Sequence, residues 1–80
     1  MTIRHLKIFT TVAECGKMGQ AAKELYISQP SVSQAIRELE EYYEVKLFDR
    51  IAKRIYLTEN GNYFAKLVRA GTYLKRGRQF

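Results

Sequence analysis

The segment from residue 21 to residue 40 constrains the fold more than any other part of the chain, because it predicts two helices joined by a tight turn. The first helix carries Ala21 and Ala22, whose small side chains permit close approach of the next helix. At about 100° per residue, the second helix has one narrow apolar stripe, formed by Val32, Ile36, Leu39 and Tyr43. The two helices are therefore expected to pack at an angle around a shared core.

The other side of the second helix has an unusual composition for an exposed surface. It carries small or neutral hydrogen-bonding residues and one arginine, namely Pro30, Ser33, Gln34 and Arg37. A face that was merely solvated would more often carry lysine and glutamate. Serine, glutamine and arginine near the start of a helix can hydrogen-bond base edges in a major groove. Sequence-specific DNA binding is therefore the first hypothesis.

The start of this helix is well marked. Ser28 is the predicted N-cap, and Gln29 and Pro30 follow in the first turn, where a proline is tolerated. Ser31 and Ser33 are interpreted as groups that meet DNA, with weak capping as the alternative. Acidic residues then follow, and phosphates would repel them: Glu38, Glu40, Glu41 and Glu44. Only the N-terminal half is therefore expected to enter the groove.

One further helix is predicted before this motif. Apolar residues at helical spacing predict a scaffold helix over residues 3–15, with Gly16 as its C-cap. The helix that contains Ala21 and Ala22 is expected to start near Gly19, as N-cap, and to run to Tyr26.

From Val45 to Leu57 the apolar period shortens, which predicts two short strands joined by a basic loop. Arg50, Lys53 and Arg54 of this small hairpin, or wing, could reach backbone phosphates or a minor groove. The alternative is an ordinary solvated hairpin tip.

Thr58 is the predicted N-cap of a last helix, with Glu59 in its first turn. The apolar stripe of this helix consists of Phe64, Leu67, Val68, Gly71 and Leu74. The stripe is expected to pair with its own copy in a dimer, and packing back onto the same domain is the alternative. We expect two units, a DNA-binding domain over residues 1–58 and a linker or dimerisation helix over residues 59–80, in a chain cut within or just after that helix.

Charge supports a polyanionic partner. Residues 1–44 hold five basic and six acidic side chains, whereas residues 45–80 hold nine and two. The basic half suggests phosphate contacts, although a solvated basic helix is the common alternative. The sequence has no apolar run of membrane-spanning length, no secretory signal, no ligand spacing for a metal and no catalytic set. We therefore expect a cytoplasmic protein that is not an enzyme, with no metal or catalytic residues.

Five segments in order resemble the N-terminal winged helix-turn-helix domain of the LysR-type transcriptional regulators. They are Arg4–Phe9 with Val12–Glu14, Ala21–Leu25, Ser28–Ser33, Ile36–Glu40, and Leu47–Arg50 with Leu57–Gly61. The resemblance covers Ile3 to about Leu67. Gln34 stands where arginine is frequent in the family, and Glu44 and Ala52 stand where glycine is common.

The resemblance implies a mainly α-helical fold, with a three-helix core, a β-hairpin wing and a long linker helix. It implies a bacterial regulator that binds promoter DNA as a homodimer or homotetramer. The groove contacts carried over by position are Gln29, Pro30, Ser31, Ser33, Gln34 and Arg37, with Lys53 or Arg54 added from the wing. A small-molecule effector is implied for a C-terminal domain that this chain lacks, and no cofactor for the chain itself. The competing hypothesis is a winged-helix module for protein–protein contact, without a specific DNA target.

Overall fold

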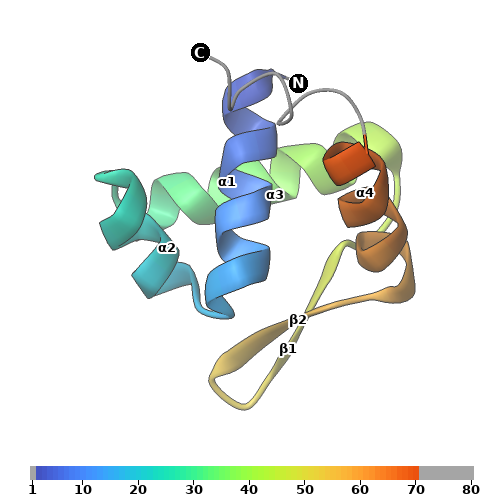
Figure 1. The fold of residues 1–80 in the computed structure, drawn as a ribbon. Helices are drawn as coiled ribbons and strands as arrows, with labels where there is room; N and C mark the ends of the chain where they lie inside the picture. The colour runs from blue at the N-terminus through green and yellow to red at the C-terminus, as the bar shows by residue number, and fades with distance from the viewer. Residues whose placement is uncertain (1, 71–80) are drawn as a thin grey trace.

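The computed structural model describes residues 2–70. Helix α1 (Ile3–Cys15), α2 (Met18–Leu25) and α3 (Gln29–Tyr43) are followed by the strands β1 (Phe48–Ile51) and β2 (Arg54–Leu57) and by helix α4 (Glu59–Ala70). In Figure 1, α1 crosses α3, α2 lies at one end of α3, and α4 lies at the other end, while the hairpin projects away from the helices. This architecture confirms the predicted winged helix-turn-helix fold.

The ends of α1 and α3 agree with their predicted caps. Gly16 takes the left-handed conformation (φ 73°), and its N–H donates to the carbonyl of Val12. The Ser28 hydroxyl accepts the backbone N–H of Ser31, as an N-cap should. Glu44 ends α3 with φ 56°, so a glutamate holds a left-handed position that favours glycine.

The predicted start of α2 at Gly19 is wrong. The helix begins at Met18, and its N-cap is Lys17, an extended residue whose side chain makes no capping hydrogen bond. The carbonyl of Lys17 accepts the N–H of Ala21, while the Met18 side chain is buried in the core. Burial of the Met18 side chain outweighs the capping preference of glycine, so the N-cap lies at Lys17, two residues before Gly19. At the other end, α2 stops at Leu25, because Tyr26 turns into the left-handed region (φ 58°).

The wing is a two-stranded antiparallel sheet in which Phe48 pairs with Leu57 and Ile51 with Arg54. Its turn contains only Ala52 and Lys53, and Ala52 has a φ of 57°. The strands are therefore joined by two residues, and the basic residues Arg50 and Arg54 belong to β1 and β2. The N–H of Ile55 donates to the carbonyl of Gly16 at 2.9 Å, which fastens β2 to the turn between α1 and α2.

The core lies between the helices and the base of the wing. Phe9 of α1 packs against the ring of Phe48 at 5.2 Å and against that of Phe64 at 4.9 Å, and Tyr43 packs on Phe64 at 5.0 Å. Phe64 of the last helix is thus a member of the domain's own aromatic cluster. Helix α4 is fixed at its start, where the Thr58 hydroxyl donates to the Lys46 carbonyl and accepts the N–H of Gly61.

No helix among residues 2–70 is long and apolar enough to cross a membrane. In the same residues, no three side chains of the His, Cys, Asp or Glu type gather where they could hold a metal ion.

Candidate nucleic-acid interface

A groove opens where the N-terminal ends of α2 and α3 meet the wing. Its lining combines Lys17, Gly19, Gln20 and Lys23 of the α2 region, Gln29 of α3, and Arg50, Ala52, Lys53 and Arg54 of the wing. The helix-turn-helix places the first turns of α2 and α3 side by side, and the bond between Ile55 and Gly16 holds the wing next to them. Three predicted wing residues and the first predicted residue of α3 therefore share one surface.

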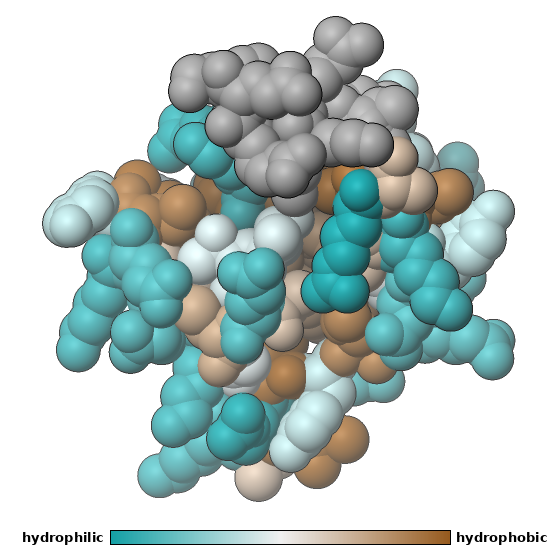
Figure 2. Space-filling model, in the orientation of Figure 1, coloured by the Kyte–Doolittle hydropathy of each residue, from teal (hydrophilic) through white to brown (hydrophobic). Residues whose placement is uncertain are grey.

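A second hollow continues this groove along α3. It is lined by Ser33, Arg37 and Glu40 of α3 together with Lys46, Asp49 and Arg50, and it shares Met18 and Arg50 with the first groove. We call the two together the basic groove. Seven cationic side chains line it, all of them exposed: Lys17, Lys23, Arg37, Lys46, Arg50, Lys53 and Arg54. In Figure 2, hydrophilic side chains project from the surface around α2 and the hairpin.

The acidic side chains in the lining reduce the positive potential of the basic groove only slightly. Glu40 is half-buried, and its carboxylate accepts the backbone N–H groups of Leu47 and Phe48 at 2.8 and 3.2 Å. These two hydrogen bonds from peptide N–H groups partly compensate the negative charge of Glu40 inside the fold. Asp49 is the remaining acid in the lining. The groove therefore has the charge expected of a surface that meets a phosphate backbone.

The structure separates the predicted reading residues of α3 into different environments. Gln29, Pro30 and Arg37 are exposed. Ser33 is half-buried, and its hydroxyl donates to the sulfur of Met18 at 3.8 Å, so it does not point directly away from the core. A residue next to Val32 is rotated by only about 100° from the apolar stripe. Ser33 therefore lies on the flank of α3 that faces α2.

Ser31 acts as a capping residue, which was the alternative to a DNA contact. Its N–H and its hydroxyl both hydrogen-bond the Ser28 hydroxyl, at 3.2 and 2.8 Å. Ser31 thus takes part in the cap of α3, although its side chain is exposed.

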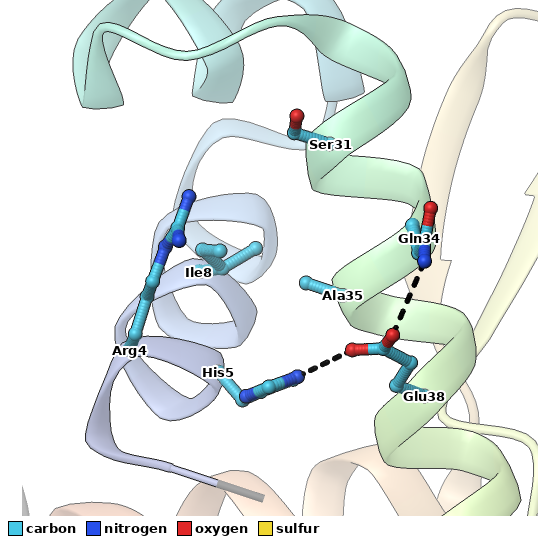
Figure 3. A pocket seen from close by; sticks show the side chains of 7 residues that line it. All are labelled: Arg4, His5, Ile8, Ser31, Gln34, Ala35 and Glu38. Atoms are coloured by element: carbon cyan, nitrogen blue, oxygen red, sulfur yellow. Dashed lines mark hydrogen bonds and ion pairs between the residues drawn. The ribbon is translucent and has the colours of Figure 1, made fainter.

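Gln34 lies on the opposite flank of α3, outside the basic groove. Figure 3 shows it in a separate hollow between α1 and α3, with Arg4, His5, Ile8, Ser31, Ala35 and Glu38. The Gln34 amide donates to Glu38 Oε2 at 3.2 Å, and His5 Nε2 lies 2.7 Å from Glu38 Oε1. These hydrogen bonds, first that of His5 and then that of Gln34, lower the pKa of the Glu38 carboxyl below its ordinary value.

The side chains of the predicted dimer stripe also lie in different environments. Val68 is buried within the chain and Phe64 is half-buried against Phe9 and Tyr43, so both side chains are already covered as the alternative proposed. Leu67 remains half exposed, with 50% of its surface accessible. Gly71 and Leu74 lie outside the described residues.

Sequence reasoning did not single out Lys17, Lys23 or Lys46 as part of the site. The helix-turn-helix pattern could have found Lys17, because it brings the start of α2 beside the start of α3, whereas Lys23 lies in the last turn of α2. The pair of His5 and Glu38 spans 33 positions of sequence, and no local spacing indicates it.

Comparison with known proteins identifies this arrangement. Residues 3–62 match the family model of bacterial regulatory helix-turn-helix proteins of the lysR family. The chain is 45% identical over 64 residues to the HTH-type transcriptional regulator TfdT of Cupriavidus pinatubonensis, covering 80% of this chain and 28% of that protein. It is 41% identical over 61 residues to the RuBisCO operon transcriptional regulator of Allochromatium vinosum, covering 76% and 20%.

Similar solved structures include DNA-binding domains bound to DNA. The CbnR_DBD–DNA complex superposes with a TM-score of 0.83 at 38% identity, covering 99% of this chain and 97% of that one. The BenM_DBD/benA site 1 DNA complex gives 0.79 at 35% identity, covering 82% and 77%. This chain spans between 20% and 42% of the length of the curated relatives it matches first. The chain belongs to the lysR family of bacterial regulatory helix-turn-helix proteins.

Proposed function

We propose that this chain binds double-stranded DNA in a sequence-specific manner, as the DNA-binding part of a transcription regulator. The N-terminal half of α3 enters the major groove, and the wing rests on the backbone or in the adjacent minor groove. The observation that carries the proposal is the basic groove, in which α2, α3, the loop before β1 and the wing together present seven exposed cations on one surface.

The relatives support this proposal. Those named above are transcriptional regulators, and both solved structures named above are complexes with DNA. A module built only for protein contact has no need of a continuous cationic surface at the start of the reading helix. The same comparison supports a protein without catalytic activity of its own.

The exposed polar side chains of α3 are proposed to specify sequence, and the wing is proposed to supply affinity. Gln29, Gln34 and Arg37 can reach base edges, with Pro30 in van der Waals contact and Ser33 at the α2 flank. Arg50, Lys53 and Arg54 bind phosphates or the minor groove irrespective of sequence. In Arg54 the guanidinium lies close to Gly16, so it must swing outward or bind at the inner edge of the groove.

The rest of the proposal concerns assembly, location and ligands. It acts as a homodimer or homotetramer in the bacterial cytoplasm, and α4 contributes to the contact through Leu67. A small-molecule effector binds a part of the regulator outside this chain. The chain itself requires no cofactor for DNA binding.

Site selection from a random duplex library tests the function. The chain is incubated with the library, and bound duplexes are recovered and sequenced over several rounds. We expect enrichment of one short motif, with Lys53→Ala lowering recovery of all duplexes and leaving the motif unchanged. Lys66→Ala, which removes an exposed cation of α4 outside the groove, is the matched control and should change neither. A library that stays random after selection, with a folded protein, would contradict the proposal.

A further inference from the structure

A chain of hydrogen bonds joins the start of α1 to the reading helix. Thr2 Oγ1 lies 2.9 Å from His5 Nδ1, and His5 Nε2 lies 2.7 Å from Glu38 Oε1. The other oxygen of the same carboxylate, Oε2, accepts the Gln34 amide N–H at 3.2 Å. Figure 3 shows the last two of these bonds, with the Gln34 and His5 side chains both directed at Glu38. Each carboxylate oxygen of Glu38 is thus engaged by a different element of the fold.

The chemistry of these partners fixes which way the Gln34 amide faces. An ionised carboxylate only accepts hydrogen bonds, so the group that Gln34 turns toward Glu38 must be its NH₂. The Oε1 carbonyl of Gln34 is then directed away from Glu38. His5 is held in the same manner: Nε2 donates to Glu38, and Nδ1 is satisfied by Thr2, whose hydroxyl donates to a neutral ring or accepts from a charged one.

The position of Gln34 makes this orientation relevant to base reading. Its side chain is exposed and lies two residues, or about 200°, from Val32, which is fully buried in the core. Gln34 therefore lies on the side of α3 that faces away from Val32 and the core. A free glutamine side chain would have to lose rotamer freedom on binding, whereas this one is already held.

We propose that Glu38 and His5 are positioning residues that present the Gln34 carbonyl oxygen to the major groove. The inference rests on the proposed DNA binding and deepens it. An outward carbonyl oxygen accepts a hydrogen bond from a base amino group. On the strand it contacts, Gln34 then selects adenine or cytosine, whose groove edges carry amino donors, and disfavours guanine and thymine, which present carbonyl oxygens there.

Selection experiments with variants test this assignment. Gln34→Ala defines the base position that Gln34 reads, because preference should be lost at that position alone. Glu38→Ala should relax preference at the same position, by roughly 5- to 150-fold for a single good base contact. His5→Ala should relax it more weakly, and Glu38→Gln, which keeps one acceptor oxygen, should give an intermediate loss. The double variant Gln34→Ala with Glu38→Ala should lose no more than Gln34→Ala.

The matched control is Glu41→Ala, which removes an equal charge from the exposed surface of α3 three residues further on. A purely electrostatic role for Glu38 would make both alanine variants bind every duplex more tightly and alike, with the motif unchanged, and would overturn the inference. A wild-type preference for guanine or thymine at the Gln34 position would also overturn it.

A second measurement needs no DNA. In the ¹H–¹⁵N spectrum of the free chain, the Gln34 side-chain NH₂ signals should move on Glu38→Ala and stay in place on Glu41→Ala. Unmoved signals in a folded variant would contradict the inference. If the wild-type chain selects no motif at all, the proposed function fails, whereas a motif insensitive to Glu38 with unmoved amide signals refutes the positioning role alone.

Discussion

Glu40 accepts the backbone N–H of Leu47 at 2.8 Å, and the same carboxylate oxygen accepts that of Phe48 at 3.2 Å. One side chain of α3 is therefore bonded to the backbone at the start of β1. Since α3 is the proposed reading helix and β1 belongs to the wing, this contact sets the angle between the two parts of the interface. Glu40 is half-buried, so water cannot readily take the place of its carboxylate as the acceptor of these two N–H groups.

We expect Glu40→Ala to lower the free energy of unfolding by about 1–3 kcal/mol, because two peptide N–H groups lose a charged acceptor. Urea denaturation followed by circular dichroism measures the change. Glu41→Ala, at an exposed position of the same helix, should change stability by no more than about 0.5 kcal/mol. Equal effects of the two substitutions would show that the Glu40 contact does not stabilise the domain.

Replacing each of two helical glycines with alanine should change the free energy of unfolding in opposite directions. A Cβ at Gly61 would overlap the carbonyl oxygen of Leu47 and lie 2.9 Å from Leu57 Cδ2, whereas one at Gly19 meets only Gln29 Oε1 at 3.7 Å. Gly61→Ala should therefore destabilise the domain by about 1–3 kcal/mol or more, since backbone must move. Gly19→Ala should stabilise it by up to about 1 kcal/mol through helix propensity.

Thermal unfolding of the two glycine variants, measured beside the wild-type chain, checks this pair. A Gly61→Ala protein as stable as the wild type would mean that α4 does not approach Leu47 as closely as described.

Glu44→Gly should stabilise the chain. Glu44 ends α3 in the left-handed conformation, which costs a residue with a Cβ roughly 1–2 kcal/mol, and its negative charge stands at the unfavourable end of the helix dipole. Glycine removes both penalties, but it also raises the entropy of the unfolded chain by about 0.4–1 kcal/mol. The net gain should be up to about 1 kcal/mol in the unfolding free energy from urea titration. A loss of stability would mean that the glutamate side chain makes a compensating contact.

The sequence predicted the architecture because its strongest local signals agree with the packing. The stripe of Val32, Ile36 and Leu39 is buried, the Ser28 and Thr58 caps form as expected, and Gly16 takes the left-handed position. Where a local preference competed with burial, burial decided the outcome. Met18 entered the core, and α2 began before Gly19.

The site was less predictable, because helical spacing gives a direction but no neighbours. It could not show that Ser33 bonds Met18 in α2, or that Gln34 is held by a carboxylate that also bonds His5 in α1. The same limit applies to the stripe predicted on the last helix. Periodicity alone could not reveal that Phe64 meets Phe9 from the other end of the domain.

The proposed dimer contact can be tested at Leu67, the half-exposed member of that stripe. If α4 pairs with its copy, Leu67→Asp buries a charge at the contact and weakens dimerisation, while the domain core remains intact. Sedimentation equilibrium at several concentrations measures the association, and Lys66→Asp at the neighbouring exposed position is the control. A wild-type chain that stays monomeric at millimolar concentration, or a Leu67→Asp chain that dimerises equally well, would refute a contact through this residue.

The most direct test of the account measures the affinity of the chain for its selected duplex and for a scrambled duplex across a range of salt concentrations. If the basic grooves of a dimer neutralise about six to ten phosphates, both affinities should fall by roughly three to five decades between about 50 and 200 mM salt. The selected duplex should remain the tighter ligand throughout, by about a thousandfold or more. Fluorescence anisotropy gives both curves. Affinities that do not change with salt, or that are equal for the two duplexes, would contradict the claim that this surface binds DNA by sequence.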